Sequence, residues 1–133
     1  MNYNQLFSSF QDQQIMVALI GAGQFGETFI RQCRRISGMQ ISFVCDLQPE
    51  RARAALLAAG YDNSAFVSVS SNEEAATALN NGQIIITADY RLISGLTLDC
   101  VVEATGSPEA AAEVGQITLM SGFHLVMITK ETD

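Results

Sequence analysis

The chain has 133 residues, a length that suits one domain. Hydrophobic residues make up 48% of it, which is enough apolar material for a core and argues against a disordered chain. Because 14 acidic residues stand against 7 basic ones, the net charge is −7 and the surface repels nucleic acid and anionic lipid. Neither nucleic acid nor a membrane is therefore an expected partner.

The N-terminus has neither a basic region nor a long apolar core, so no secretory signal is expected. No apolar run approaches the roughly 20 residues that a membrane-spanning helix needs. The cysteines Cys33, Cys45 and Cys100 form no CxxC pair, and the single histidine, His124, does not complete a zinc site with them. We expect reduced thiols, no metal site and a cytoplasmic location.

The N-terminal segment, residues 1–14, is expected to be an amphipathic helix followed by a polar link. Its apolar side chains recur at helical spacing, and we expect their aromatic side to dock on the domain or on a partner. These side chains are Tyr3, Leu6, Phe7 and Phe10.

From residue 15 onward, runs typical of strands alternate with stretches typical of helices. Strands are predicted at residues 15–20, 40–45, 84–87, 98–104 and 124–129. Helices are predicted after Gly23 and at residues 49–59, 71–79 and 107–121. An apolar piece at residues 66–69 is not assigned, and residues 89–95 fit a short helix or turn. The alternation predicts an α/β protein with a Rossmann-type, doubly wound, mainly parallel sheet and helices on both faces.

Each predicted helix is followed by a glycine, a residue that suits the left-handed backbone at a helix C-terminus. These are Gly38, Gly60, Gly82 and Gly122. In the first of these helices, the side chains expected to face the sheet are Phe25, Phe29, Ile30, Cys33 and Ile36.

The stretch IMVALIGAGQFG, residues 15–26, reads as a buried strand, a glycine turn and the start of a helix. Gly21 permits the sharp turn, Gly23 lets a pyrophosphate approach the backbone, and Gly26 lets the helix pack against the strand. Gln24 and Phe25 then begin the helix, whose free N–H groups and partial positive charge suit phosphates. The pattern predicts a dinucleotide site.

Asp46 ends the next predicted strand, 20 residues after Gly26. A carboxylate there accepts hydrogen bonds from adenosine ribose hydroxyls and repels a 2′-phosphate, which favours NAD over NADP. Arg51 lies one turn into the following helix. We favour a solvated helix residue for Arg51, with a phosphate contact as the alternative.

The stretch VVEATG, residues 101–106, places a small-residue loop at the carboxyl end of a strand, where ligands bind in such sheets. Thr105 and Gly106 are expected to line the nicotinamide side of the cofactor. For Glu103 two roles stay open: it faces the ligand, or it is a strand-end carboxylate bonded to backbone N–H groups.

Visible catalytic groups are few. A charged cluster at the end of the chain, Lys130, Glu131 and Asp133, is expected to be solvent-exposed, with a substrate contact as the alternative. No Ser-His-Asp set, Cys-His pair or metal cluster stands out in the sequence. The sequence thus indicates the means to bind a cofactor and little means to do chemistry alone, and it leaves the catalytic residues unknown.

Five stretches of the sequence are informative together: VALIGAGQFGETFIRQ, CDLQPERARAAL, the pair IIITADYRLI and DCVVEATGSPEAAA, and HLVMITKETD. They resemble the N-terminal domain of homoserine dehydrogenase-like oxidoreductases, above all the subgroup with a C-terminal SAF domain, which includes 1-deoxy-D-xylulose 5-phosphate reductoisomerase-like enzymes. The resemblance covers residues 15–133.

The resemblance implies that residues 15–133 are the NAD(P)-binding Rossmann domain of a longer protein. Hydride transfer would then use a small-molecule substrate held mostly by missing C-terminal domains, and a homo-oligomer stays open. Cofactor roles carry over to Gly21, Gly23, Gly26, Asp46, Thr105 and Gly106. Reductoisomerase-like members are expected to use NADPH, against the preference that Asp46 indicates. The Asn-Lys pair of homoserine dehydrogenases is absent at residues 129–131, so Lys130 receives no catalytic role.

Two other functions compete with this one. The same sheet suits a regulatory module that senses the NADH/NAD ratio without catalysis and passes the signal to a partner through the aromatic N-terminal helix. S-adenosylmethionine binding also uses a glycine loop and an acid after the second strand. The GxGxxG spacing and the EATG loop make this last function the least favoured.

Overall fold

The computed structural model of the chain describes residues 13–130. The helix expected within residues 1–14 lies almost wholly outside this range. Strands and helices alternate along the chain, as the hydrophobic pattern predicts. In order they are β1 (Ile15–Ile20), α2 (Gln24–Arg35), β2 (Met39–Cys45), α3 (Pro49–Ala58), η1 (Asn63–Ala65), β3 (Phe66–Ser68), α4 (Asn72–Asn80), β4 (Ile84–Thr87), η2 (Tyr90–Gly95), β5 (Cys100–Glu103), α5 (Pro108–Met120) and β6 (His124–Met127).

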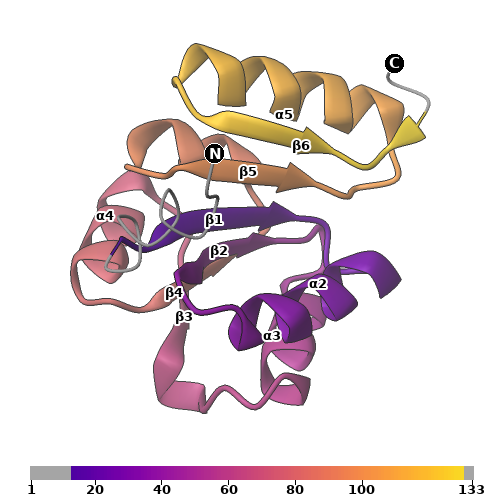
Figure 1. Ribbon diagram of the computed structural model, residues 1–133. Helices are drawn as coiled ribbons and strands as arrows, with labels where there is room; N and C mark the ends of the chain where they lie inside the picture. Colours follow the sequence, from indigo (N-terminus) through magenta and orange to yellow (C-terminus); the bar gives the residue numbers. More distant parts are fainter. Residues whose placement is uncertain (1–12, 131–133) are drawn as a thin grey trace, which may run out of the picture.

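The strands form one six-stranded sheet in the order β3-β4-β2-β1-β5-β6, and every neighbouring pair is parallel (Figure 1). The predicted α/β, Rossmann-type fold is therefore confirmed. From β1 the chain moves to β2 on one side, and it later returns to place β5 on the other side. The order in which strands are added to the sheet therefore reverses at β1. Open α/β sheets bind their ligands at such a point.

The apolar piece at residues 66–69, which the sequence left unassigned, contains the edge strand β3. Phe66 pairs with Ile84 and Val67 with Ile85 of β4. With three residues, β3 is too short to show an alternating pattern. Its pairing depends on long-range contact with β4, which a local pattern does not encode.

Two cores fill the two faces of the sheet. On one face α2 and α3 supply Ile30, Cys33 and Leu56, and on the other α4, η2 and α5 supply Ala75, Ile93 and Val114. Because helices cover both faces, the central strand β1 is buried at its last four residues, which explains its unbroken apolar run.

The expected inner face of α2 is wrong at two positions. Phe25 is 43% exposed and Ile36 is 48% exposed, whereas Gly26, Ile30 and Cys33 are buried. The buried residues follow the i, i+4, i+7 spacing of one helix face. Phe25 lies one residue, or about 100°, away from that face. Ile36 is the extended C-cap residue, beyond the end of the helix.

Helix ends follow the predicted capping chemistry. Ser71 accepts a hydrogen bond from the Glu74 amide at 3.1 Å, which confirms Ser71 as the N-cap of α4. The Glu74 carboxylate accepts from the Ser71 hydroxyl at 3.2 Å, whereas the reciprocal bond of a capping box comes from the backbone amide. Ser107 caps α5 by accepting from the Ala110 amide, and Pro108 occupies the first turn.

Among residues 13–130, no helix has the length and apolar character needed to cross a membrane.

Candidate functional site

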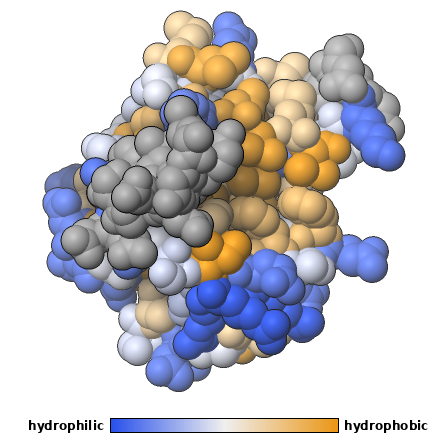
Figure 2. All heavy atoms as spheres, viewed as in Figure 1, coloured by the Kyte–Doolittle hydropathy of each residue, from blue (hydrophilic) through white to orange (hydrophobic). Residues whose placement is uncertain are grey.

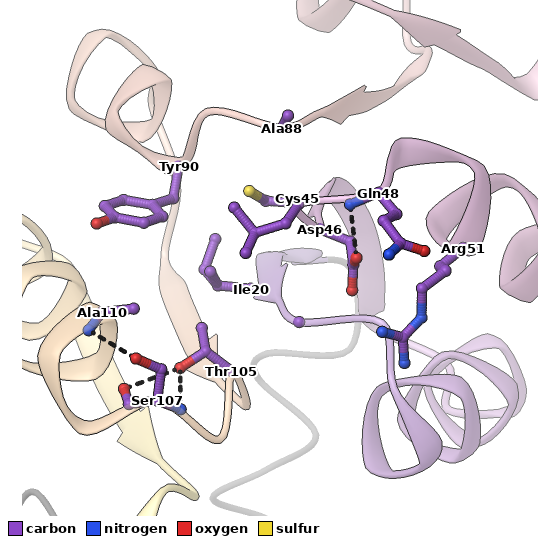
Figure 3. Close-up of a pocket in the computed structure, with 12 residues that line it drawn as sticks. Ile20, Cys45, Asp46, Gln48, Arg51, Ala88, Tyr90, Thr105, Ser107 and Ala110 are labelled. Atoms are coloured by element: carbon purple, nitrogen blue, oxygen red, sulfur yellow. Dashed lines mark hydrogen bonds between the residues drawn. The ribbon is translucent and has the colours of Figure 1, made fainter.

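A cleft of about 250 Å³ opens at the carboxyl ends of the strands, at the point beside β1 where the strand order reverses (Figure 3). Its walls come from the ends of β1, β2 and β4, from the β5–α5 loop, and from the starts of α3, η2 and α5. They are Ile20, Gly21, Cys45, Asp46, Leu47, Gln48, Arg51, Ala88, Tyr90, Thr105, Ser107 and Ala110. Three of the residues that the sequence predicts as cofactor contacts, Gly21, Asp46 and Thr105, thus meet around one cavity.

The turn between β1 and α2 requires glycine at two positions. Gly21 has φ +107°, and a Cβ atom there would collide with the carbonyl oxygen of Ala104. A Cβ atom on Gly26 would collide with the carbonyl oxygen of Gly21 and lie 3.2 Å from Leu19. The geometry therefore matches the turn and close-packing functions expected of these two residues.

Helix α2 begins at Gly23, the second glycine of the motif, without a side-chain cap. Gly23 is the N-cap residue, and its carbonyl accepts only the first intrahelical bond, from the Glu27 amide at 2.9 Å. The amides of Gln24 and Phe25 lie in the first turn, where backbone donors lack intrahelical acceptors. This end of α2 thus offers donors and a partial positive charge to an anion.

Asp46 ties the end of β2 to the glycine turn. Its Oδ2 accepts a hydrogen bond from the Ala22 amide at 2.9 Å, and its Oδ1 accepts one from the Gln48 amide at 2.9 Å. The dashed line in Figure 3 marks the bond to Gln48. A carboxylate has about four acceptor positions, so both oxygens keep capacity for a further donor.

Arg51 extends from α3 toward the glycine turn, as Figure 3 shows. Its Nη2 lies 3.3 Å from the position of a Cβ atom on Gly23. In the described part of the chain, no salt bridge joins Arg51 to a carboxylate. The side chain is exposed, as we expected, but its guanidinium also lines the cleft beside the uncapped end of α2.

Glu103 is a structural carboxylate at the end of β5 that bonds to backbone N–H groups, the second of the two roles left open by the sequence. It is fully buried below the loop that follows β5. Its carboxylate accepts hydrogen bonds from the amide and hydroxyl of Thr105, at 2.8 and 2.7 Å. It also accepts from the amide and hydroxyl of Thr129, at 3.2 and 2.8 Å. The Gly106 amide donates to the Thr129 hydroxyl at 3.0 Å, so one carboxylate organises the ends of β5 and β6.

The hydrogen bonds decide the charge of Glu103. Burial disfavours the ionised form, but the bonds donated by Thr105 and Thr129 outweigh burial and hold the pKa of this carboxyl below its usual value. Because the Thr105 hydroxyl donates to Glu103, its proton is already engaged. Thr105 therefore serves first as an anchor of the loop that borders the cleft.

The sequence did not indicate a cluster behind Tyr90, which lines the cleft on the wall opposite Arg51. The hydroxyl of Tyr90 donates to the Glu113 carboxylate at 2.6 Å, and Arg91 Nε donates to the same carboxylate at 2.9 Å. The hydrogen bond from Tyr90 lowers the pKa of Glu113, and the same bond raises the pKa of Tyr90. No local pattern joins η2 to α5, so the sequence carried no signal for this cluster.

Cys45 lines the cleft but is chemically quiet. Burial, followed by the nearby carboxylates of Asp46 and Asp89, raises the pKa of its thiol to about 12. The thiol therefore stays protonated and acts as a small apolar wall. Across residues 13–130, no group of three or more His, Cys, Asp or Glu side chains is arranged to hold a metal ion.

The other predicted contacts lie outside the cleft lining. Gln24 is exposed at the start of α2, and Gly26 is buried beneath it. The Phe25 ring lines a separate groove on the sheet face. Lys130 is exposed, whereas Glu131 and Asp133 lie outside the described residues. Whether the predicted residues contact a cofactor stays a prediction.

The fold and the glycine turn define a Rossmann-type nucleotide-binding domain. Residues 16–96 match the family described as "NADP oxidoreductase coenzyme F420-dependent", and the chain belongs to this family. It carries the NAD(P)-binding Rossmann-type domain of this oxidoreductase family. No curated protein sequence matches it.

Solved structures share the fold. They include an oxidoreductase from Klebsiella pneumoniae (TM-score 0.59, 22% identity, 87% of this chain and 27% of that one). The WlbA dehydrogenase from Bordetella pertussis, in complex with NADH and UDP-GlcNAcA, matches with a TM-score of 0.56 and 22% identity over 86% of this chain and 29% of that one. The myo-inositol dehydrogenase from Lactobacillus casei, in complex with NAD(H) and myo-inositol, matches with a TM-score of 0.52 and 14% identity over 86% of this chain and 36% of that one. The chain thus spans about a third of the length of these proteins.

Proposed function

We propose that residues 15–133 bind NAD(H) or NADP(H) in the cleft and serve a homoserine dehydrogenase-like oxidoreductase as its cofactor-binding domain. The main support for this proposal is that the uncapped N-terminus of α2 and Asp46 lie together at the carboxyl ends of the strands. The SAF-domain subgroup rests on the sequence resemblance alone. A bound nicotinamide would supply the hydride chemistry, with the substrate held largely outside this chain.

The residues divide the work of binding by their chemistry. The first-turn amides of Gln24 and Phe25, together with the side-chain-free Gly23, suit the pyrophosphate. The Asp46 carboxylate suits the hydroxyls of the adenosine ribose. Thr105 and Gly106 then border the nicotinamide side, held in place by Glu103 and Thr129.

Two side chains, Asp46 and Arg51, have opposite effects on the preference between NAD and NADP. The negative charge of Asp46 opposes a 2′-phosphate and favours NAD. Arg51 stands beside Gly23 without a carboxylate partner in residues 13–130 and would favour an additional phosphate. We propose NAD, because Asp46 is fixed by two backbone hydrogen bonds whereas the Arg51 side chain is exposed.

Calorimetric titration of the chain with NAD(H) and NADP(H) tests both parts of the proposal. We expect saturable binding and a preference for NAD(H). In Asp46→Asn, the shape of the side chain is kept but its charge is lost, and NAD(H) affinity should fall about tenfold or more relative to NADP(H), since a hydrogen bond to a charged group contributes ~1.5–3 kcal/mol.

The exposed residue Asp62 provides the matched control, because Asp62→Asn makes the same change away from the cleft. This variant should bind both nucleotides as the unmodified chain does. Equal losses for NAD(H) and NADP(H) in Asp46→Asn would refute the ribose role, and no saturable heat with a folded sample would refute cofactor binding altogether.

A further inference from the structure

A second hollow lies on the sheet face that α2 and α3 partly cover. These two helices pack over β1, β2 and β4. On this side they leave β6 largely exposed, whereas Val102 of β5 is buried at the margin of their core. The resulting groove has a volume of about 530 Å³. Its lining includes Ile15, Val17, Phe25, Phe29, Val102 and Val126. Figure 2 shows apolar side chains gathered in a hollow on this face.

The groove exposes large apolar side chains that a parallel sheet normally buries. Ile15 is 47% exposed, Phe25 43% and Val126 45%, and Ile128 beyond the end of β6 is 37% exposed. Ile15, Phe25 and Val126 line the same groove, so their exposure forms one patch and not scattered single residues. Such a patch indicates a surface that another segment covers.

The N-terminal end of the described chain is part of this groove. Gln13 and Gln14 lie in its wall, so residues 1–12 join the domain at the groove itself. The sequence of that segment suits an apolar floor: its only charged side chain is Asp12. Its apolar residues recur at helical spacing, with Tyr3, Leu6, Phe7 and Phe10 on one side of the predicted helix.

We propose that residues 1–12 dock in this groove and place their aromatic side on β5 and β6. The dimensions agree, because neighbouring strands lie ~4.8 Å apart and a helix with its side chains is ~10 Å wide, so one helix covers two strands. Twelve helical residues extend about 18 Å, enough to cover the full length of the four-residue strands β5 and β6, which span about 13 Å at ~3.3 Å per residue. The segment thereby completes the second layer of helices over the sheet.

A tryptophan in the groove reports on its occupant, because the chain contains no other tryptophan. In Val126→Trp, we expect fluorescence emission at short wavelength, and deletion of residues 1–12 should shift it to longer wavelength. Leu119→Trp is the matched control: Leu119 is 64% exposed on α5, away from the groove, so its emission should not change on deletion.

Point variants separate docking from a general effect of deletion. In the Val126→Trp protein, Phe7→Asp combined with Phe10→Asp should reproduce the shift. Ser8→Asp, on the opposite side of the predicted helix, should leave the emission unchanged. Emission insensitive to the deletion would overturn the proposal. So would emission that changes with protein concentration while light scattering reports a dimer, because a second copy would then occupy the groove.

Discussion

Replacing Glu103 with Gln tests whether a single buried carboxylate holds the loop beside the cleft. In the native chain Oε2 accepts three hydrogen bonds, from the amide and hydroxyl of Thr105 and the hydroxyl of Thr129. Oε1 accepts one, from the Thr129 amide. Gln keeps the shape of the side chain but replaces one acceptor oxygen with an NH₂ donor.

The magnitude follows from which oxygen is lost. The least damaging arrangement places NH₂ at the Oε1 position, where it faces the Thr129 amide, a donor that has no freedom to rotate. Replacing the charged acceptor of this buried amide by a donor costs about 1–3 kcal/mol. The three remaining bonds change from charged to neutral acceptors and weaken, while the smaller desolvation of a neutral amide offsets part of that loss. We expect a net loss of roughly 2–4 kcal/mol in the free energy of unfolding.

Urea denaturation followed by circular dichroism measures this loss, with Asp62→Asn as the control. Asp62 is exposed, so the same change from carboxylate to amide should alter the free energy of unfolding by no more than about 0.5 kcal/mol. If Glu103→Gln is as stable as the unmodified chain at pH 7, the carboxylate does not hold the loop.

The pH dependence gives a second check with a definite sign. Because folding lowers the pKa of Glu103, its contribution is fully present above the unfolded value of about 4.3 and is lost as the pH falls through the folded pKa. The stability difference between the unmodified chain and Glu103→Gln should be constant from about pH 7 to pH 5 and shrink in more acidic solution. A difference that grows on acidification would contradict the assigned direction.

Two further predictions follow from the cleft walls. Gly21→Ala should destabilise the chain by about 2 kcal/mol or more in urea denaturation, since φ is +107° and the new Cβ meets the Ala104 carbonyl oxygen. Gly82→Ala, at φ +72° with nothing within 4 Å, should cost only about 1–2 kcal/mol, and equal losses would refute the close approach. For Cys45, a thiol pKa of about 12 predicts alkylation at pH 8 about 10³-fold slower than for an ordinary cysteine. Rapid labelling of Cys45 in the folded chain, by peptide mapping, would refute its protonated, enclosed state.

The sheet and its glycine turn were predictable because both depend on local signals. The apolar run of β1 and the spacing from Gly21 to Asp46 appear directly in the sequence. Capping by Ser71 was equally local. The edge strand β3 was not predictable, because three residues carry no period and the strand is defined by its pairing with β4.

The finer details of the site depended on contacts between distant segments. Glu103 meets Thr129 across 26 positions, so the sequence left its role open between a ligand contact and a structural carboxylate. The bond from Tyr90 to Glu113 joins η2 to α5 and left no trace in either segment. For Phe25, hydrophobicity alone suggested burial against the sheet, whereas its angular position on α2 directs it toward the groove.

We propose that the glycine turn and Asp46 together hold the cofactor. Titration of ¹⁵N-labelled chain with NADH, followed by backbone amide chemical shifts, tests it most directly. We predict saturable shifts at Gly23, Gln24 and Phe25, at Asp46, and at the loop containing Thr105, all with one dissociation constant. Shifts confined to other parts of the chain, or none at saturating NADH and NADPH, would contradict a cofactor site at the glycine turn and Asp46.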